Sequence, residues 1–290
     1  MKKFAKVAAC AALALTCIAS AACADFDASK SINVISREDG SGTRGAFIEL
    51  TGVEQKVDGQ KVDMTTVDAQ ITNNTAVMIA TVGGDSYAIG YVSLGSMNDT
   101  VKAVKVEGVE ATAQTVADGT YKVARPFNIA YKEDTLSDLG KDFVAYIMSA
   151  EGQAIINENG YVGGNDAAAY AGNAPEGKLV IAGSSSVSPV MEKLVEAYCA
   201  LNTGATIEVQ TSDSTTGMTS AMDGTCDIGM ASRELKEEEA AALTAQAIAM
   251  DGIAVIVSND NPVEDLSVEQ IAAIFTGEVT NWDEVIDAAE

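Results

Sequence analysis

Strand-like and helix-like segments alternate along almost the whole chain after residue 30. Residues 32–35, 101–106 and 253–257 have the composition of strands, and 253–257 is apolar throughout, as in the centre of a covered sheet. Helical patterns lie between them, for example over 43–50 and 137–157. Because such alternation builds a parallel or mixed sheet with helices on its faces, the sequence predicts an α/β fold.

Three strand-to-helix turns are rich in glycine, serine and threonine: 37–43 (REDGSGT), 183–188 (GSSSVS) and 211–217 (TSDSTTG). A helix start exposes unpaired backbone N–H groups and partial positive charge, and short hydroxyl side chains add donors. Such a turn suits an oxyanion, and Arg37 adds a permanently charged fork. A single serine-rich turn is usually an ordinary helix cap, and a single arginine usually pairs with an acidic neighbour. Three such turns in one α/β chain indicate an anion site.

The formal net charge of −24 and the absence of histidine narrow the function classes. Strong negative charge would repel phosphate backbones, so we expect no nucleic-acid partner. Without histidine the chain lacks the usual base for a serine nucleophile and the commonest zinc ligand. We therefore expect no enzyme activity, no metal and no cofactor. A secreted phosphate-ester hydrolase is the less favoured alternative.

Residues 1–24 have the composition of a secretion signal. Three lysines fall in the first six residues, an apolar run covers 7–18, and small residues follow. Cleavage after the small residues around Cys23 would release a free protein, whereas lipid modification of Cys23 would anchor it. Both outcomes remain open. We expect the chain in the periplasm or on the outer face of the cell membrane, and we expect a lipid on Cys23 to be its one attachment to the membrane.

Cys199 and Cys226 are the two cysteines beyond the signal region. In an oxidising compartment they could form a disulfide. Two small, buried and unpaired side chains are the alternative, and we favour it.

The turns and several further motifs resemble those of the phosphate-binding proteins of phosphate ABC importers. The matching stretches are 37–44 (REDGSGTR), 183–187, 210–217, 227–233 (DIGMASR), 251–257 (DGIAVIV) and 274–282 (IFTGEVTNW). The resemblance implies the two-lobed periplasmic-binding-protein type II fold, with a mixed sheet flanked by helices in each lobe and two crossing strands at 125–131 and 253–258. It also implies a membrane permease as partner.

The resemblance further implies which residues form the site. An acidic residue in the turn after the 227–231 strand accepts the proton of hydrogen phosphate in well-known family members; here its place falls on Ser232 or Arg233. Asp213, Asp227 or Asp39 could supply the acceptor instead. Phosphate therefore stays open against sulfate, molybdate or a phosphonate. Asp39 would brace Arg37. The residues implied to contact the anion are Arg37, Ser41, Gly42, Thr43, Ser185, Ser186 and Ser214.

The two halves of the chain stand in the reverse of the family order, which resembles a circular permutation. The join would lie in 162–177, a linker rich in glycine, asparagine and alanine, and the cut between Glu290 and Ser31. One lobe would then combine 31–122 with 258–290 and carry the Arg37 turn, and the other would span 123–257. A misassembled gene and a domain-swapped dimer are the alternatives.

Overall fold

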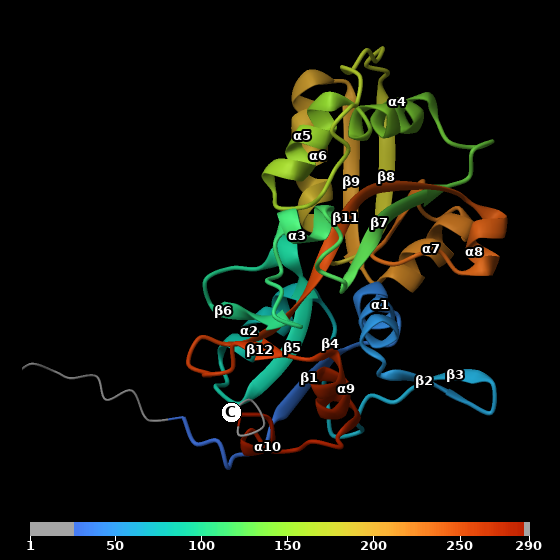
Figure 1. The fold of residues 1–290 in the computed structure, drawn as a ribbon. Helices are drawn as coiled ribbons and strands as arrows, with labels where there is room; N and C mark the ends of the chain where they lie inside the picture. The colour runs from blue at the N-terminus through green and yellow to red at the C-terminus, as the bar shows by residue number, and fades with distance from the viewer. Residues whose placement is uncertain (1–25, 287–290) are drawn as a thin grey trace, which may run out of the picture.

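The computed structural model describes residues 26–286, and its main feature is one ten-stranded mixed sheet (Figure 1). The strand order is β4-β1-β5-β11-β7-β10-β8-β9. In addition, β6 pairs with β11, and β12 pairs with β6. A two-stranded hairpin stands apart from this sheet. The predicted α/β class is confirmed. The strands are β1 (Asn33–Arg37), β2 (Glu54–Val57), β3 (Gln60–Asp63), β4 (Gln70–Thr72), β5 (Ala88–Ser93), β6 (Val101–Val106), β7 (Ala124–Tyr131), β8 (Gly177–Ser184), β9 (Ala205–Ser212), β10 (Ile228–Ala231), β11 (Thr244–Ser258) and β12 (Asp265–Leu266).

Helices flank both halves of the sheet, and the helix Gly42–Thr51 matches the helical pattern predicted over 43–50. The stretch 137–157, predicted as one helical segment, is instead two helices, because the Ser149 hydroxyl accepts a hydrogen bond from Gly152 N and starts a new helix there. The helices are α1 (Gly42–Thr51), α2 (Thr75–Gly83), the 3-10 turn η1 (Leu94–Ser96), α3 (Ala113–Ala117), α4 (Asp138–Ile147), α5 (Ala150–Glu158), α6 (Ser188–Leu201), α7 (Ser214–Asp223), α8 (Glu237–Ala242), α9 (Val268–Thr276) and α10 (Asp283–Ile286).

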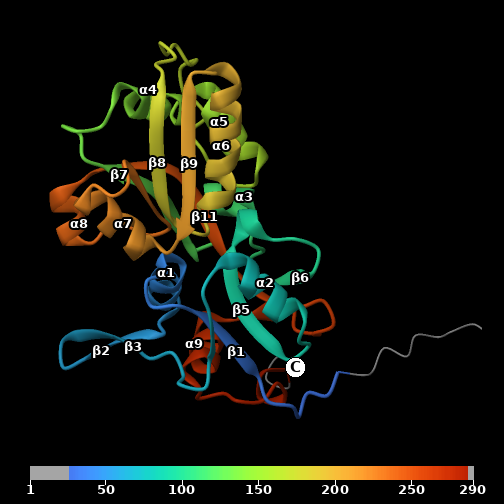
Figure 2. The same ribbon diagram turned by 180° about the vertical axis from the view of Figure 1, so that it is seen from behind.

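Strand β11 joins the two halves of the sheet. Its first part, from Thr244 to Gly252, pairs antiparallel with β7, and its second part, from Ile253 to Ser258, pairs antiparallel with β5 and β6. The predicted crossing strand 253–258 is thus only the second part of a 15-residue strand. Strands β7 and β11 carry the chain across the boundary (Figures 1 and 2).

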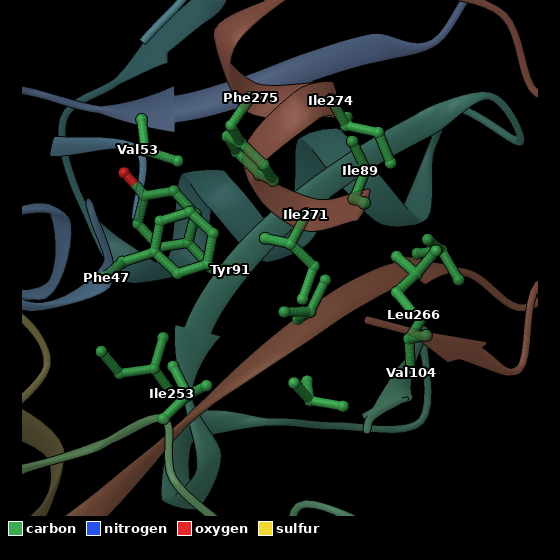
Figure 3. Close-up of a cluster of buried hydrophobic side chains, with 14 of the residues drawn as sticks. Phe47, Val53, Ile89, Tyr91, Val104, Ile253, Leu266, Ile271, Ile274 and Phe275 are labelled. Carbon is green, nitrogen blue, oxygen red and sulfur yellow. The ribbon is translucent and has the colours of Figure 1, made fainter. Parts of the chain in front are cut away.

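Buried side chains gather in separate clusters on the two sides of this boundary. On one side, hydrophobic residues between Ile32 and Val123 pack with residues from Ile253 to Val285. The Phe47 and Tyr91 rings stack there at 4.0 Å between centroids (Figure 3). On the other side, the clusters draw only on residues from Phe127 to Ala249. We propose that these two groups are the two lobes, with boundaries near residues 123 and 253.

The two ends of the described chain lie side by side (Figure 2). Asp283 N donates to Ala28 O at 2.7 Å, and Ser31 pairs with Asn281 in an isolated bridge. The segment 162–177 has almost no regular structure, as predicted, yet it is held against its lobe. The Tyr170 hydroxyl donates to Asp142 of α4. Adjacent ends are what a circular permutation requires, and the permutation stays a prediction.

Three further expectations concern the termini and cysteines. The signal segment 1–24 and Cys23 lie outside the described residues. Within 26–286, none of the helices has the length and apolar character needed to cross a bilayer. Cys199 and Cys226 are both free, as expected, but only Cys226 is buried and Cys199 is half-buried. Burial raises the pKa of the Cys226 thiol to about 11.

Candidate anion-binding site

Four helices begin at the boundary between the lobes, and residues at or just before their first turns contact one another. Thr43 of α1 lies 2.8 Å from Ser186, which precedes α6, between their hydroxyl oxygens. Thr75, the first residue of α2, lies 3.1 Å from the same Ser186 oxygen. Each helix start contributes unpaired N–H groups and partial positive charge. The sequence predicted α1, α6 and α7 in this role, and α2 was missed.

Ser232, after β10, connects the remaining hydroxyls. It accepts a hydrogen bond from Ser184 Oγ at 2.9 Å and lies 3.4 Å from Ser214 Oγ and 3.3 Å from Thr43 Oγ1. The seven hydroxyl residues of this network, which we call the hydroxyl cluster, are at most 6% exposed. They are Thr43, Thr75, Ser184, Ser185, Ser186, Ser214 and Ser232. Sequence reasoning missed Thr75 and Ser184.

Arg37, at the end of β1, points into the hydroxyl cluster and is 2% exposed. Its Nη2 donates to Ser185 Oγ at 3.0 Å, and its Nη1 donates to Thr75 Oγ1 at 3.4 Å. Glu38 holds the other edge of the guanidinium, accepting from Nε at 2.8 Å and from Nη2 at 2.7 Å. Asp39 does not brace Arg37, contrary to expectation. Its exposed carboxylate instead pairs with Arg44 at 2.8 Å.

Tyr91 fixes the backbone that carries Arg37. The Tyr91 hydroxyl accepts a hydrogen bond from Arg37 N at 3.2 Å and lies 2.8 Å from Ser36 Oγ. Burial raises the pKa of Tyr91 to about 12, so the phenol keeps its proton at neutral pH. Because Arg37 N is the donor in the first contact, the phenol proton is free to go to Ser36.

Arg125, in β7, is a second buried guanidinium that sequence reasoning did not assign to the site. Its Nη2 donates to Thr43 Oγ1 at 3.0 Å, and its Nε donates to the Ser232 carbonyl at 3.2 Å. Its Nη1 donates to the Asp251 carboxylate and to Gly252 O. The available signal was an arginine within an otherwise largely apolar predicted crossing strand, where a charge needs a partner.

The pair of Arg125 and Asp251 sits where β7 and β11 cross between the lobes. Burial raises the pKa of the Asp251 carboxyl, and the adjacent Arg125 guanidinium counteracts that rise. Burial also lowers the pKa of Arg125, against the effect of Asp251. Each buried cation of the site therefore has its own carboxylate, Glu38 for Arg37 and Asp251 for Arg125, and Nη2 of each arginine also donates to a hydroxyl of the cluster.

Arg233, one of the two residues at the place of the family's acidic acceptor, does not join the hydroxyl cluster. Glu239 of α8 binds both ends of its guanidinium at 2.7 and 2.8 Å, which turns the side chain away from the hydroxyl cluster. Ser41 lies beside the cluster without joining it. Its hydroxyl caps α1 by accepting from Arg44 N at 3.3 Å.

The lobes touch each other at the site. A Cβ placed on Gly42 would stand 2.4 Å from Ser214 Oγ, so only glycine permits this approach. Thr215 N donates across the boundary to Gly40 O at 3.2 Å. A groove of 1160 Å³ between α2 and α6 reaches the cluster at Thr75 and Ser185.

Comparison with known proteins identifies the family of the chain. The PBP superfamily domain matches residues 21–151 and 168–290. The chain is 52% identical over 270 residues to phosphate-binding protein PstS 2 of Streptococcus agalactiae serotype V, covering 91% of this chain and 92% of that protein. It is 43% identical over 290 residues to PstS 2 of Streptococcus pneumoniae serotype 4, covering 98% and 99%.

A solved structure gives the same result. The phosphate-binding protein of a phosphate ABC transporter from Streptococcus pneumoniae matches with a TM-score of 0.71 and 45% identity, over 88% of this chain and 99% of that chain. The two sequence matches run nearly end to end, so those relatives share the order of halves seen here. The chain therefore belongs to the PstS family of phosphate-binding proteins, within the PBP superfamily.

Proposed function

We propose that this chain captures inorganic phosphate between its lobes and delivers it to the membrane permease of an ABC importer. One observation carries the proposal: two buried arginines, seven buried hydroxyls and four helix starts converge at one place. The relatives named as phosphate-binding proteins support the choice of ligand.

The chemistry of the donors fits a small tetrahedral anion. Hydroxyl groups rotate, so each can turn its proton toward an oxygen of the ligand. The arginine edges add charge-assisted hydrogen bonds, and the helix starts add backbone donors around the same point. Burial strengthens each of these interactions, because little water competes for them. Together these groups can surround an oxyanion from both lobes.

We propose a binding protein and not an enzyme. The hydroxyls of the cluster contact other hydroxyls, arginine N–H groups and backbone N–H groups. None of these partners is a base that could activate a serine. We also place the protein outside the cytoplasm, in keeping with its signal-like N-terminal segment and its PstS relatives. Mass spectrometry of the exported protein distinguishes a cleaved, free protein from one that carries a lipid on Cys23.

The decisive experiment is calorimetric titration of the chain lacking residues 1–24 with phosphate. We expect one saturable site and a compaction of the molecule that follows occupancy. A folded protein, as judged by circular dichroism, that gives no binding signal with phosphate would contradict the proposal.

A further inference from the structure

Every hydrogen-bond partner of the hydroxyl cluster is a hydroxyl or an N–H group. Thr43 contacts Ser186, Ser232 and Arg125. Ser185 and Thr75 contact each other and Arg37. Ser214 accepts from Ser232 N at 3.1 Å. Among the described residues, no carboxylate oxygen bonds to any of the seven hydroxyls.

The carboxylates nearest to the cluster are bound to other groups. Glu38 accepts two hydrogen bonds from Arg37, and Asp251 accepts from Arg125 and from Gly95 N. Asp213 caps α7, with its oxygens accepting from Thr216 N at 2.8 Å and Thr216 Oγ1 at 2.6 Å. None of these carboxylates shares a hydrogen bond with a hydroxyl of the cluster.

The missing acceptor matters because it decides which anions fit. An ionised carboxylate accepts hydrogen bonds and cannot donate them. It therefore binds an anion with an O–H group and repels an anion oxygen that has no proton. A hydroxyl does both, since it can accept from a protonated oxygen or donate to a bare one. A cluster of hydroxyls and N–H groups therefore does not require a proton on its ligand.

We propose that this site takes tetrahedral oxyanion dianions with or without a proton, so that sulfate competes with hydrogen phosphate for it. The inference rests on the proposed function, because it concerns the same site. It identifies Ser232 as the position that sets the selectivity. Ser232 is 1% exposed and touches hydroxyls from both lobes, Thr43 on one side and Ser184 and Ser214 on the other.

The test is a pair of titrations, with phosphate and with sulfate. They are carried out on the native sequence and on two variants of Ser232 whose new side chains are equal to each other in size. For the native sequence we expect the dissociation constant for sulfate divided by that for phosphate to stay below about 10³. A site built to bind a ligand O–H group rejects an analogue without that group by roughly 10⁴–10⁵. Ser232→Asp introduces an acceptor-only group, and we expect it to raise the ratio at least about tenfold. Ser232→Asn is the neutral control, and we expect it to leave the ratio within about threefold even if both affinities fall.

The possible failures are distinct. Tight phosphate binding with a native ratio above about 10³ overturns this inference and leaves the proposed function standing. No phosphate binding at all overturns the proposed function. An equal change of ratio in the Asp and Asn variants also overturns the assignment of Ser232. Should Ser232→Asp fail to fold by circular dichroism, the ratio measured on the native sequence still decides.

Discussion

Each arginine of the site is buried together with a carboxylate of its own, and this arrangement has a physical reason. A buried, unpaired guanidinium would carry a large desolvation cost. Glu38 and Asp251 offset that cost and also fix the direction of each fork. Nη2 of each arginine is thereby held toward the cluster before any anion arrives. This preorganisation reduces the ordering cost of binding.

Replacing Arg37 tests the contribution of this side chain to phosphate binding. Arg37→Ala removes two donors and leaves the Glu38 carboxylate without its partner close to the site. We expect phosphate affinity to fall by about 2–5 kcal/mol, as for one side of a buried charge pair, measured by calorimetry. The matched control is Arg233→Ala, because Glu239 holds Arg233 away from the cluster. We expect this control to change affinity by less than about threefold, and a loss under tenfold for Arg37→Ala would count against its assigned role.

At the scale of elements, the irregular segment 162–177 is held against its lobe by hydrogen bonds to the neighbouring helices, among them bonds to Asp142 and Glu151. Asp142 of α4 accepts hydrogen bonds from the Tyr170 and Tyr198 hydroxyls and from Asn173 N. Burial alone would raise the pKa of Asp142, but these hydrogen bonds outweigh it and the pKa is lowered. The ionised carboxylate thereby fastens the irregular segment 162–177 to α4 and α6.

We expect Asp142→Asn to lower the free energy of unfolding by about 1 kcal/mol, since the lost bonds are charge-assisted but partly solvent-screened. A carboxyl whose pKa is lower in the folded than in the unfolded state stabilises the protein at pH values above its unfolded pKa. The contribution of Asp142 is therefore present at neutral pH and is lost as the pH falls from about 4 through the folded value. Urea unfolding at several pH values measures both effects. The control is Asp134→Asn, at an exposed aspartate in the preceding turn, and equal effects of the two variants would contradict this role.

At the scale of the whole molecule, the site exists only where the lobes meet. Thr43 and Arg37 come from one lobe and Ser186 and Ser232 from the other, so binding is coupled to the approach of the lobes. The two strands β7 and β11 cross between the lobes and are the natural place for a hinge (Figure 1). Arg125 on β7 contacts the cluster through Thr43, and Asp251 on β11 pairs with Arg125.

Gly42→Ala tests this coupling. The added Cβ would stand 2.4 Å from Ser214 Oγ, so the lobes cannot approach as closely. We expect phosphate affinity to fall at least about tenfold while the unfolding transition stays cooperative. Small-angle scattering should show less compaction on phosphate addition. Gly45→Ala, in the same helix, is the control, because its nearest neighbour would be 4.0 Å away; identical behaviour of the two variants would show that closure does not depend on Gly42.

The adjacent ends allow a test of the predicted permutation. A chain that begins at Ala167, ends at Asp166 and joins residue 286 to residue 28 through about five glycine and serine residues restores the order of halves that the permutation presumes. We expect it to fold and to bind phosphate within about tenfold of the native sequence, because Asp283 N and Ala28 O are already hydrogen-bonded. A rearranged chain that does not fold would show that the present order is required.

Local features of the fold and the site were predictable from the sequence. Strand and helix periods and the three serine-rich turns depend on neighbouring residues, and the structure shows them. Five of the anion-site residues implied by the resemblance, Arg37, Thr43, Ser185, Ser186 and Ser214, lie in one hydrogen-bonded network in the structure. Their role in binding stays a prediction.

Long-range contacts were decided only by the tertiary structure. Arg125 reaches the site because β7 crosses between the lobes, and Thr75 does so because α2 begins beside Ser185. Likewise, the choice of Glu38 over Asp39 for Arg37, and of Glu239 for Arg233, depends on side-chain directions that neighbouring residues do not fix. The sequence by itself determined which turns could hold an anion, since helix starts and hydroxyls are local properties. Which of them face each other, and with what charges between, depends on how distant segments pack, and only the folded molecule determines that.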